Sequence, residues 1–403
     1  MRLSLRAALM VGALIASSEA ALAEPVTLAQ ALTQGAEHSP RVAQAKAKAE
    51  AAQARARQAG ASPNPELSVE VENFAGTGVF QGFRSMETTL ALSQRLELGG
   101  KRGARVAVAS AERDFASLSF RAAMADLARE IRVSHAELRA AEERALLARA
   151  NVAQARELAR SAKELVEAGR DPPLRQLRAE AVLAEAKAEE ARSFGDLLAA
   201  RRMLADLMGS NDPELSATVV ADETAPAVLE QETPSLDEQL ATAERDAALA
   251  RVRVARSDAV PDITASGGVR RMNDGRETAV VAGFSIPLPF WDRNRGAIEA
   301  AHAEGLASEA ALAQVRLDAR RAQHDARMLL GAADARVEAL TGPALAQADE
   351  AVRLAQIGYG AGKFSLVELL DAQAALTTAK LALIEARLDR ARALAALIRA
   401  NAQ

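Results

Sequence analysis

The sequence of 403 residues contains no cysteine, one tryptophan, one tyrosine and only four histidines. The absence of cysteine excludes disulfide bonds, Cys-ligated metal sites and a lipid-modified N-terminal Cys. His38, His135, His302 and His324 lack the i, i+3 or i, i+4 spacing of helical metal ligands. No pattern indicates an activated nucleophile beside a base. We therefore expect neither an enzyme nor a resident cofactor or metal.

The sequence also lacks a strong net charge and has few large aromatic side chains. The formal net charge of -4 provides no basic surface for nucleic acid. Aromatic residues make up 3% of the chain, which leaves few large side chains for a globular core. The apolar residues are mostly alanine and leucine, and with abundant arginine and glutamate they are typical of long helices packed closely together. This composition favours one elongated body.

The N-terminal residues 1–23 have the three regions of an export signal. Arg2 and Arg6 supply positive charge, an apolar run covers 7–15, and Ala21-Leu22-Ala23 is a small-x-small cleavage site. We predict that this signal peptide is removed. No later segment reaches about 18 uninterrupted apolar residues, so no transmembrane helix is expected.

The rest of the chain is organised as an internal repeat. Gly103 and Gly296 each follow a strand-like stretch and open a long helical pattern, and they lie 193 residues apart. Gly169 and Gly362 interrupt these helical patterns with the same offset of 193 residues. A shared offset at two landmarks predicts two equivalent halves. The predicted divisions are a first repeat at 24–209, a Pro-containing linker at 210–234 and a second repeat at 235–403.

Each half is predicted to hold an entry helix and a long helical hairpin. From Phe120 to Val166, apolar residues recur at spacings of three and four, and only Ser134 in this seam is polar. The whole helical stretch between Gly103 and Gly169 spans 66 residues and would be about 100 Å long. An isolated antiparallel coiled coil also explains the pattern. The entry helices are expected at 28–61 and 236–259, and the hairpins at 103–208 and 296–402, with tips at 169–174 and 360–366.

Two further segments, 64–98 and 261–289, alternate with a period of two and predict β-hairpins. In the first, Leu67, Val69 and Val71 point to one face, and the other face carries the polar residues Glu66, Ser68, Glu70 and Glu72. Strands of about 10 residues with one apolar face fit transmembrane β-strands, and soluble hairpins are the alternative. In a bilayer the strands must close. Four strands are too few to close a barrel, so we expect the chain to oligomerise; three chains would give twelve strands, four from each.

These features together resemble the TolC-type outer-membrane efflux proteins, over essentially the whole mature chain. The strings NPELSVEVENF at 64–74, SQRLELGGKR at 93–102 and AGKFSLVELLDAQ at 361–373 look most like the cobalt–zinc–cadmium efflux branch. The resemblance implies a mainly α fold with a small β part, a periplasmic helical tunnel and a 12-stranded trimeric barrel in outer-membrane lipid. Two features depart from some relatives: the missing N-terminal Cys and the rigid Asp171-Pro172-Pro173 turn.

The function implied is a passive exit duct of a tripartite efflux pump. Its partners would be a periplasmic adaptor and an inner-membrane, proton-driven pump of the resistance-nodulation-division type. Divalent heavy-metal cations such as cobalt, zinc and cadmium are the expected cargo. A duct for drugs or secreted polypeptides is an alternative, and a periplasmic coiled-coil scaffold without a pore is another.

Three groups of residues are candidates for function. Strand parity places carboxylates and one arginine inside the barrel, where threefold rings would concentrate cations. Opposite charges just after the two tips, at the shared offset, are predicted to close the periplasmic gate. The tips themselves are expected to contact the adaptor. The lumen residues are Glu66, Glu70, Glu72, Arg95 and Glu97; the gate residues are Arg175, Arg178, Glu368 and Asp371; the tip residues are Gly169, Leu174, Gly362, Phe364 and Leu366.

Overall fold

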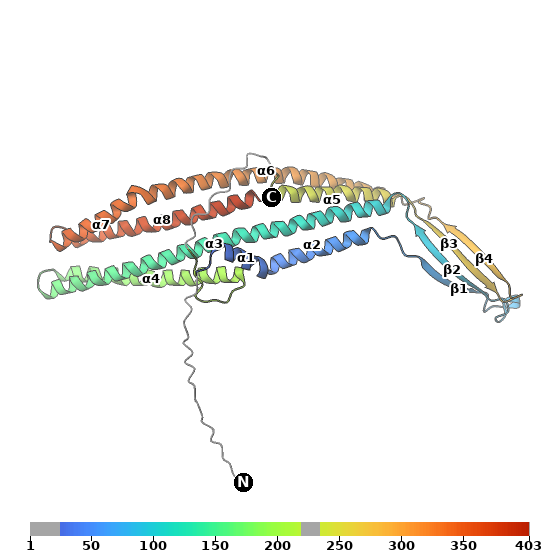
Figure 1. Ribbon diagram of the computed structural model, residues 1–403, viewed down its shortest axis with the longest axis horizontal. Helices are drawn as coiled ribbons and strands as arrows, with labels where there is room; N and C mark the ends of the chain where they lie inside the picture. Colours follow the sequence, from blue (N-terminus) through green and yellow to red (C-terminus); the bar gives the residue numbers. More distant parts are fainter. Residues whose placement is uncertain (1–24, 219–233, 403) are drawn as a thin grey trace, which may run out of the picture.

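The computed structural model describes residues 25–218 and 234–402 as a long helical bundle that continues at one end into a small sheet (Figure 1). The predicted signal peptide and most of the predicted linker lie outside the described residues. Among the described residues, no helix is both long and apolar enough to cross a bilayer. The prediction of a mainly helical fold with a small β part is confirmed.

The first half is dominated by α3 (Lys101–Glu167), an uninterrupted helix of 67 residues, and by α4 (Pro173–Met208), which runs back along it. Its buried positions include Leu127, Ile131, Leu138, Ala145 and Ala162, which confirms the seam expected from the sequence. Small alanine side chains in this seam let α4 pack closely on α3. The helix begins two residues before the predicted start at Gly103.

The entry segment differs from the single helix expected at 28–61. It forms α1 (Leu28–His38) and α2 (Pro40–Ala59). Ser39 separates them, because its side chain accepts a hydrogen bond from the Val42 N–H and Pro40 stands at the first helical position. A serine N-cap followed by proline starts a new helix and ends the previous one.

The second half repeats this layout with one interruption. It contains α5 (Leu236–Asp258), α6 (Arg295–Ala339), α7 (Leu345–Gly360) and α8 (Leu366–Ala400). Between α6 and α7 lies the π-helical segment η2 (Leu340–Ala344), which holds Pro343 and a non-helical Gly342. Proline has no N–H for the helical ladder, so the rod breaks here. The equivalent rod of the first half, α3, is continuous.

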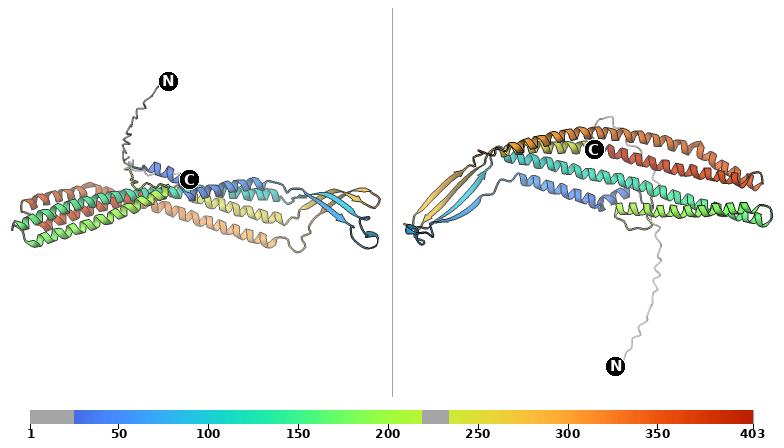
Figure 2. Two further views of the ribbon diagram at one scale, coloured as in Figure 1. Left: turned by 90° about the horizontal axis from the view of Figure 1, so that it is seen from below. Right: turned by 180° about the vertical axis from the view of Figure 1, so that it is seen from behind.

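The four predicted strand segments form one antiparallel sheet in the order β1-β2-β3-β4. The strands are β1 (Glu66–Glu72), β2 (Glu87–Leu96), β3 (Ile263–Met272) and β4 (Thr278–Ser285); a 3-10 turn, η1 (Gly78–Phe80), lies in the first hairpin loop. The register aligns Val69, Leu90, Val269 and Val280 in one row across the sheet. None of the helices that the structure describes covers this sheet, which projects from the end of the bundle (Figure 2). Val69 is 64% exposed and Val280 86%.

Candidate functional site

The polar face of the sheet gathers the predicted lumen residues of the strands. The register places Glu66 opposite Ser93 and Glu70 opposite Thr89, on the face that also carries Glu72 and Arg95. Within the described residues, neither Glu66 nor Glu70 forms an ion pair. Both edge strands, β1 and β4, have an unpaired side in the single chain.

Glu72 is different, because Arg270 of β3 holds it. The guanidinium lies 3.2 Å from the Glu72 carboxylate and 3.0 Å from that of Glu87, and its Nε donates to the Thr89 hydroxyl at 2.9 Å. Arg270 and Glu87 were not among the residues singled out from the sequence. Strand parity alone placed Arg270 on the polar face, but its ion pairs depend on the register between β2 and β3, which joins the two halves.

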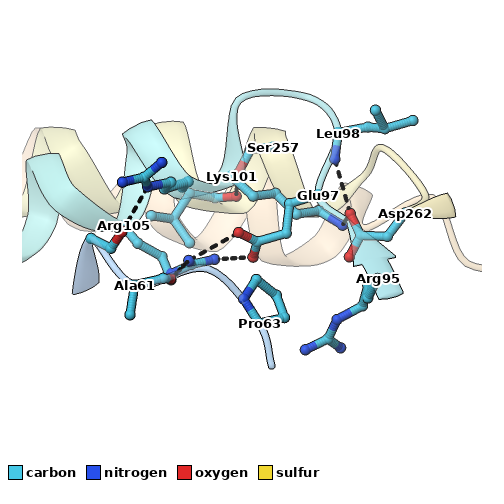
Figure 3. A network of polar contacts seen from close by, with 12 residues as sticks. Ala61, Pro63, Arg95, Glu97, Leu98, Lys101, Arg105, Ser257 and Asp262 are labelled. Atoms are coloured by element: carbon cyan, nitrogen blue, oxygen red, sulfur yellow. Dashed lines mark hydrogen bonds and ion pairs between the residues drawn. The ribbon is translucent and has the colours of Figure 1, made fainter. Parts of the chain in front are cut away.

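Glu97 lies beyond the end of β2, at the junction of sheet and helices, and is not grouped with the other lumen carboxylates (Figure 3). Arg105 of α3 binds both of its carboxylate oxygens, and the same guanidinium donates to the Ala61 carbonyl at 3.3 Å. The hydrogen bonds from Arg105 lower the pKa of Glu97. Its charge is therefore already compensated within the chain.

A second ion pair at the junction connects the two halves. Lys101, the first residue of α3, donates to Asp262, just before β3, at 2.7 Å, and the Leu98 N–H donates to the same oxygen at 3.2 Å (Figure 3). Burial opposes ionisation of Asp262, but these hydrogen bonds outweigh it and lower its pKa. Gly99 permits the close approach, since a Cβ there would lie 2.7 Å from Val260.

At the opposite end of the bundle, the two tips have equivalent backbones. Gly169 and Gly362 end α3 and α7 with φ of 70° and 73°, a left-handed conformation that suits glycine. In the second tip, the Phe364 ring covers Gly358 so closely that a Cβ there would lie 2.2 Å from it. Ser365 and Glu368 form a capping box that starts α8.

The exposure of the tip side chains corrects one expectation. Leu174 is 70% exposed and Phe364 is 45% exposed, so both are available to a partner. Leu366 is 2% exposed, and the prediction that it presents itself to the adaptor is wrong. Its side chain fills the core between the two halves, against Leu158 and Ala162 of α3.

The predicted gate charges do not pair with one another inside one chain. Arg175 binds Asp171 of its own tip instead. Glu368 is occupied by its cap, and the Ser365 backbone N–H lowers its pKa by donating to the carboxylate at 2.6 Å. Arg178 and Asp371 are exposed and form no ion pair among the described residues. Pairing of Arg178 with Asp371 between neighbouring chains stays a prediction.

Tyr359, which was not among the candidates from the sequence, lies at the interface of the two tips. Its hydroxyl is buried and has no hydrogen-bond partner among the residues that the structure describes. Burial raises the pKa of Tyr359, and the nearby charge of Asp171 raises it further. Tyr359 is the single tyrosine of the chain, which is the one signal in the sequence that could have drawn attention to it. Its proximity to Asp171 could not be predicted, because it depends on how α7 packs on the first tip.

The fold and these sites define a class of protein: an elongated helical bundle that carries a sheet with an exposed apolar face, suited to a membrane. The model for the family "Outer membrane efflux protein" matches residues 31–210 and 228–403, and the chain belongs to this family. This confirms the resemblance seen in the sequence and places the protein in the outer membrane, with its helical part in the periplasm.

Individual relatives agree with this assignment. The chain is 34% identical to the nickel-cobalt-cadmium resistance protein NccC of Alcaligenes xylosoxydans xylosoxydans over 63% of its length, and it spans 59% of NccC. It is 30% identical to the cobalt-zinc-cadmium resistance protein CzcC of Cupriavidus metallidurans, over 73% of this chain and 72% of CzcC. The fold matches that of CusC with a TM-score of 0.80 at 20% identity, covering 93% of this chain and 92% of CusC.

Proposed function

We propose that this protein is the outer-membrane exit duct of a heavy-metal efflux pump. The observation that carries the proposal is the sheet, whose exposed apolar face and two unpaired edges are joined to a bundle built on a 67-residue helix. Unpaired strand edges are not tolerated in hydrocarbon. In this proposal β1 of one chain pairs with β4 of the next, and three chains close a barrel.

The path for cargo follows from the same arrangement. Once the apolar face contacts lipid, the polar face with Glu66 and Glu70 surrounds an aqueous lumen that continues between the helices. Carboxylates repeated around a threefold axis raise the local concentration of cations. The chain needs no catalytic group for this task, because the energy comes from elsewhere in the pump.

Heavy-metal cations are the proposed cargo because both relatives are named for resistance to cobalt and cadmium, together with nickel for NccC and zinc for CzcC. Outer membrane efflux proteins work as trimers within tripartite pumps. For this chain we propose a periplasmic adaptor at the tips, with Leu174 and Phe364 as exposed anchors, and an inner-membrane resistance-nodulation-division pump behind it.

The experiment is complementation with a matched cargo control. A strain that lacks its CzcC-type component but keeps the adaptor and pump is given this chain, and growth is measured on cobalt, zinc and cadmium and on a panel of drugs. We expect restored growth on the metals alone. Restored resistance to drugs instead of metals would show that drugs, and not metal cations, are the cargo. Recovery of the protein as a monomer in the soluble periplasmic fraction would contradict the proposal of a duct.

A further inference from the structure

Six ion pairs between described residues join the two halves of the chain along α3, and four of them place an acid on α3 and an arginine on α5 or α8. They begin at the junction with the sheet and continue down the bundle. The pairs and their N–O distances are Lys101–Asp262 at 2.7 Å, Glu112–Arg251 at 2.7 Å, Asp126–Arg399 at 2.5 Å, Glu137–Arg392 at 2.9 Å, Glu143–Arg387 at 3.6 Å and Arg144–Glu385 at 2.5 Å. We call this series the ion-pair ladder.

The ladder stops well before the tips. Beyond Arg144–Glu385, the described residues contain only one further hydrogen bond between the halves, from Thr377 to Asn151 at 3.5 Å. From there to the tips the halves meet through apolar side chains. On the first half these are Leu158, Ala159, Ala162 and Ala179, and on the second they are Ala355, Leu366 and Leu369. Hydrophobic contact is not directional, so such surfaces slide more readily than paired charges.

The π-helical segment η2 lies at the level where the ladder ends. The two α8 residues whose ion pairs with the second-half rod lie nearest to η2 are Asp389, which binds Arg336 before it, and Lys380, which binds Asp349 after it. Glu385, the last rung of the ladder, lies between those two α8 residues. The end of the ladder and the break in the rod therefore coincide.

The backbone of η2 is suited to bending. Gly342 has φ -80° and ψ -133°, outside the helical region, and Pro343 lacks an N–H. No residue of the segment is buried, so no packed side chain resists a change in its angle. Kinks at proline and at π-helical turns are recognised sites of bending. The equivalent stretch of α3 is an unbroken helix.

We infer that η2 is the hinge of the periplasmic aperture: α7 and the tip loop that follows it (Leu345–Ser365) pivot there against the first tip. The ladder keeps α5 and the part of α8 from Glu385 onward fixed on α3 during this motion. Phe364 moves with the arm, because it is seated on Gly358 of α7. This inference rests on the proposed duct function, since only a duct has an aperture to open.

Hydrogen exchange on the purified wild-type trimer tests the hinge without any transport assay. The amides of 341–346, of which Pro343 has none, are expected to exchange at least about tenfold faster than those of 148–153, the stretch of α3 that lies at the shared offset. Equal protection of the two stretches overturns the inference. Because this readout does not depend on conductance, it holds even if the protein forms no channel.

Single-channel recording tests the functional consequence. The double variant Gly342→Ala and Pro343→Ala restores helix-forming residues, and we expect it to open at least about tenfold less often. Gly331→Ala is the matched control, because Gly331 lies in α6 above the hinge and an added Cβ meets nothing within 4 Å. Should the double variant lose its trimer, Pro343→Ala alone takes its place. A variant that opens like wild type overturns the hinge while the duct stands, and a wild-type protein that forms no channel contradicts the duct itself.

Discussion

Arg399, near the end of α8, holds Asp237 in the first turn of α5 through two parallel hydrogen bonds of 2.8 and 3.0 Å. Its Nε donates to Asp126 of α3 at 2.5 Å. One guanidinium thus joins three helices from both halves. The bidentate bonds to Asp237 raise the pKa of Arg399 further above its ordinary value, so the group is always charged.

Replacing this guanidinium is expected to loosen the middle of the bundle. Arg399→Lys keeps the charge but loses the fork that binds Asp237, at an expected cost of about 1–2 kcal/mol in the free energy of unfolding. Thermal melting of the helices, followed by circular dichroism on the trimer, measures it. Arg353→Lys is the control, because Arg353 pairs with Glu350 on an exposed helix face and its loss should leave the melting midpoint unchanged.

The lumen carboxylates should differ in their effect on ion selectivity. Glu66 and Glu70 are free of ion pairs among the described residues, whereas Arg270 compensates Glu72 and Arg105 compensates Glu97. We expect Glu66→Gln with Glu70→Gln to lower the cation-over-anion permeability ratio at least about twofold. Glu72→Gln and Glu97→Gln should change it less. Reversal potentials in asymmetric KCl measure the ratio, and equal effects of all four substitutions would contradict this account.

Periodicity was sufficient to predict the helices and strands because each element buries or exposes one face. A spacing of three and four located the seam of α3, and a period of two located all four strands. The break at Ser39-Pro40 was equally local, a serine cap followed by proline, but the surrounding helical composition masked it. The Gly342-Pro343 break was missed for the same reason.

Side-chain partners were harder to predict, since they depend on register between distant segments. The offset of 193 residues correctly related Gly169 to Gly362, but it related charges only by depth along the rod. Whether Arg175 meets Glu368 depends on how the helices are rotated about their axes, and in the chain Arg175 turns to Asp171. For the same reason Leu366 was expected on the surface and lies in the core.

Burial of an acidic residue beside the linker predicts a dependence of stability on pH. Glu142 of α3 accepts a hydrogen bond from the Ala217 N–H at 3.3 Å. Burial raises its pKa above the ordinary 4.5, although Ala217, Arg201 and Arg139 oppose the shift. The folded chain therefore binds this proton more tightly than the unfolded chain. Its contribution to stability is greatest below about pH 4.5 and declines as pH rises through the folded pKa.

Glu142→Gln removes this titration and keeps an oxygen to accept the Ala217 N–H. Its melting temperature should exceed that of wild type at about pH 7 and equal it at about pH 4. Glu143→Gln is the control, because Glu143 contacts Arg139 and Arg387 and is not expected to gain stability when neutral. Melting curves at both pH values measure this difference. A Glu142→Gln variant that is less stable than wild type at neutral pH would contradict a raised pKa for Glu142.

Arg178 and Asp371 provide the sharper test of the gate, since neither forms an ion pair within the described part of its own chain. If they pair between neighbouring chains, Arg178→Glu leaves like charges facing each other around the aperture. We expect higher conductance in planar bilayers, and the added substitution Asp371→Arg should lower it again. Asp171→Asn breaks the ion pair between Asp171 and Arg175 within one chain. It therefore tests the alternative that this intrachain pair holds the tip closed. If the Arg178→Glu variant conducts like wild type, these charges do not hold the gate closed.

Substitutions at two residues of the tips should distinguish contact with the adaptor from packing inside the chain. Leu174 is 70% exposed, so Leu174→Asp is expected to leave the trimer and its melting temperature unchanged while resistance falls to the level of the deletion strain. Leu366 is 2% exposed, and Leu366→Ala should cost about 2–4 kcal/mol by leaving a cavity against Leu158 and Ala162. Growth on metal, together with melting of the purified trimer, distinguishes the two losses. Resistance that survives Leu174→Asp would mean that the adaptor binds elsewhere, because a buried charge on a contacting surface is strongly unfavourable.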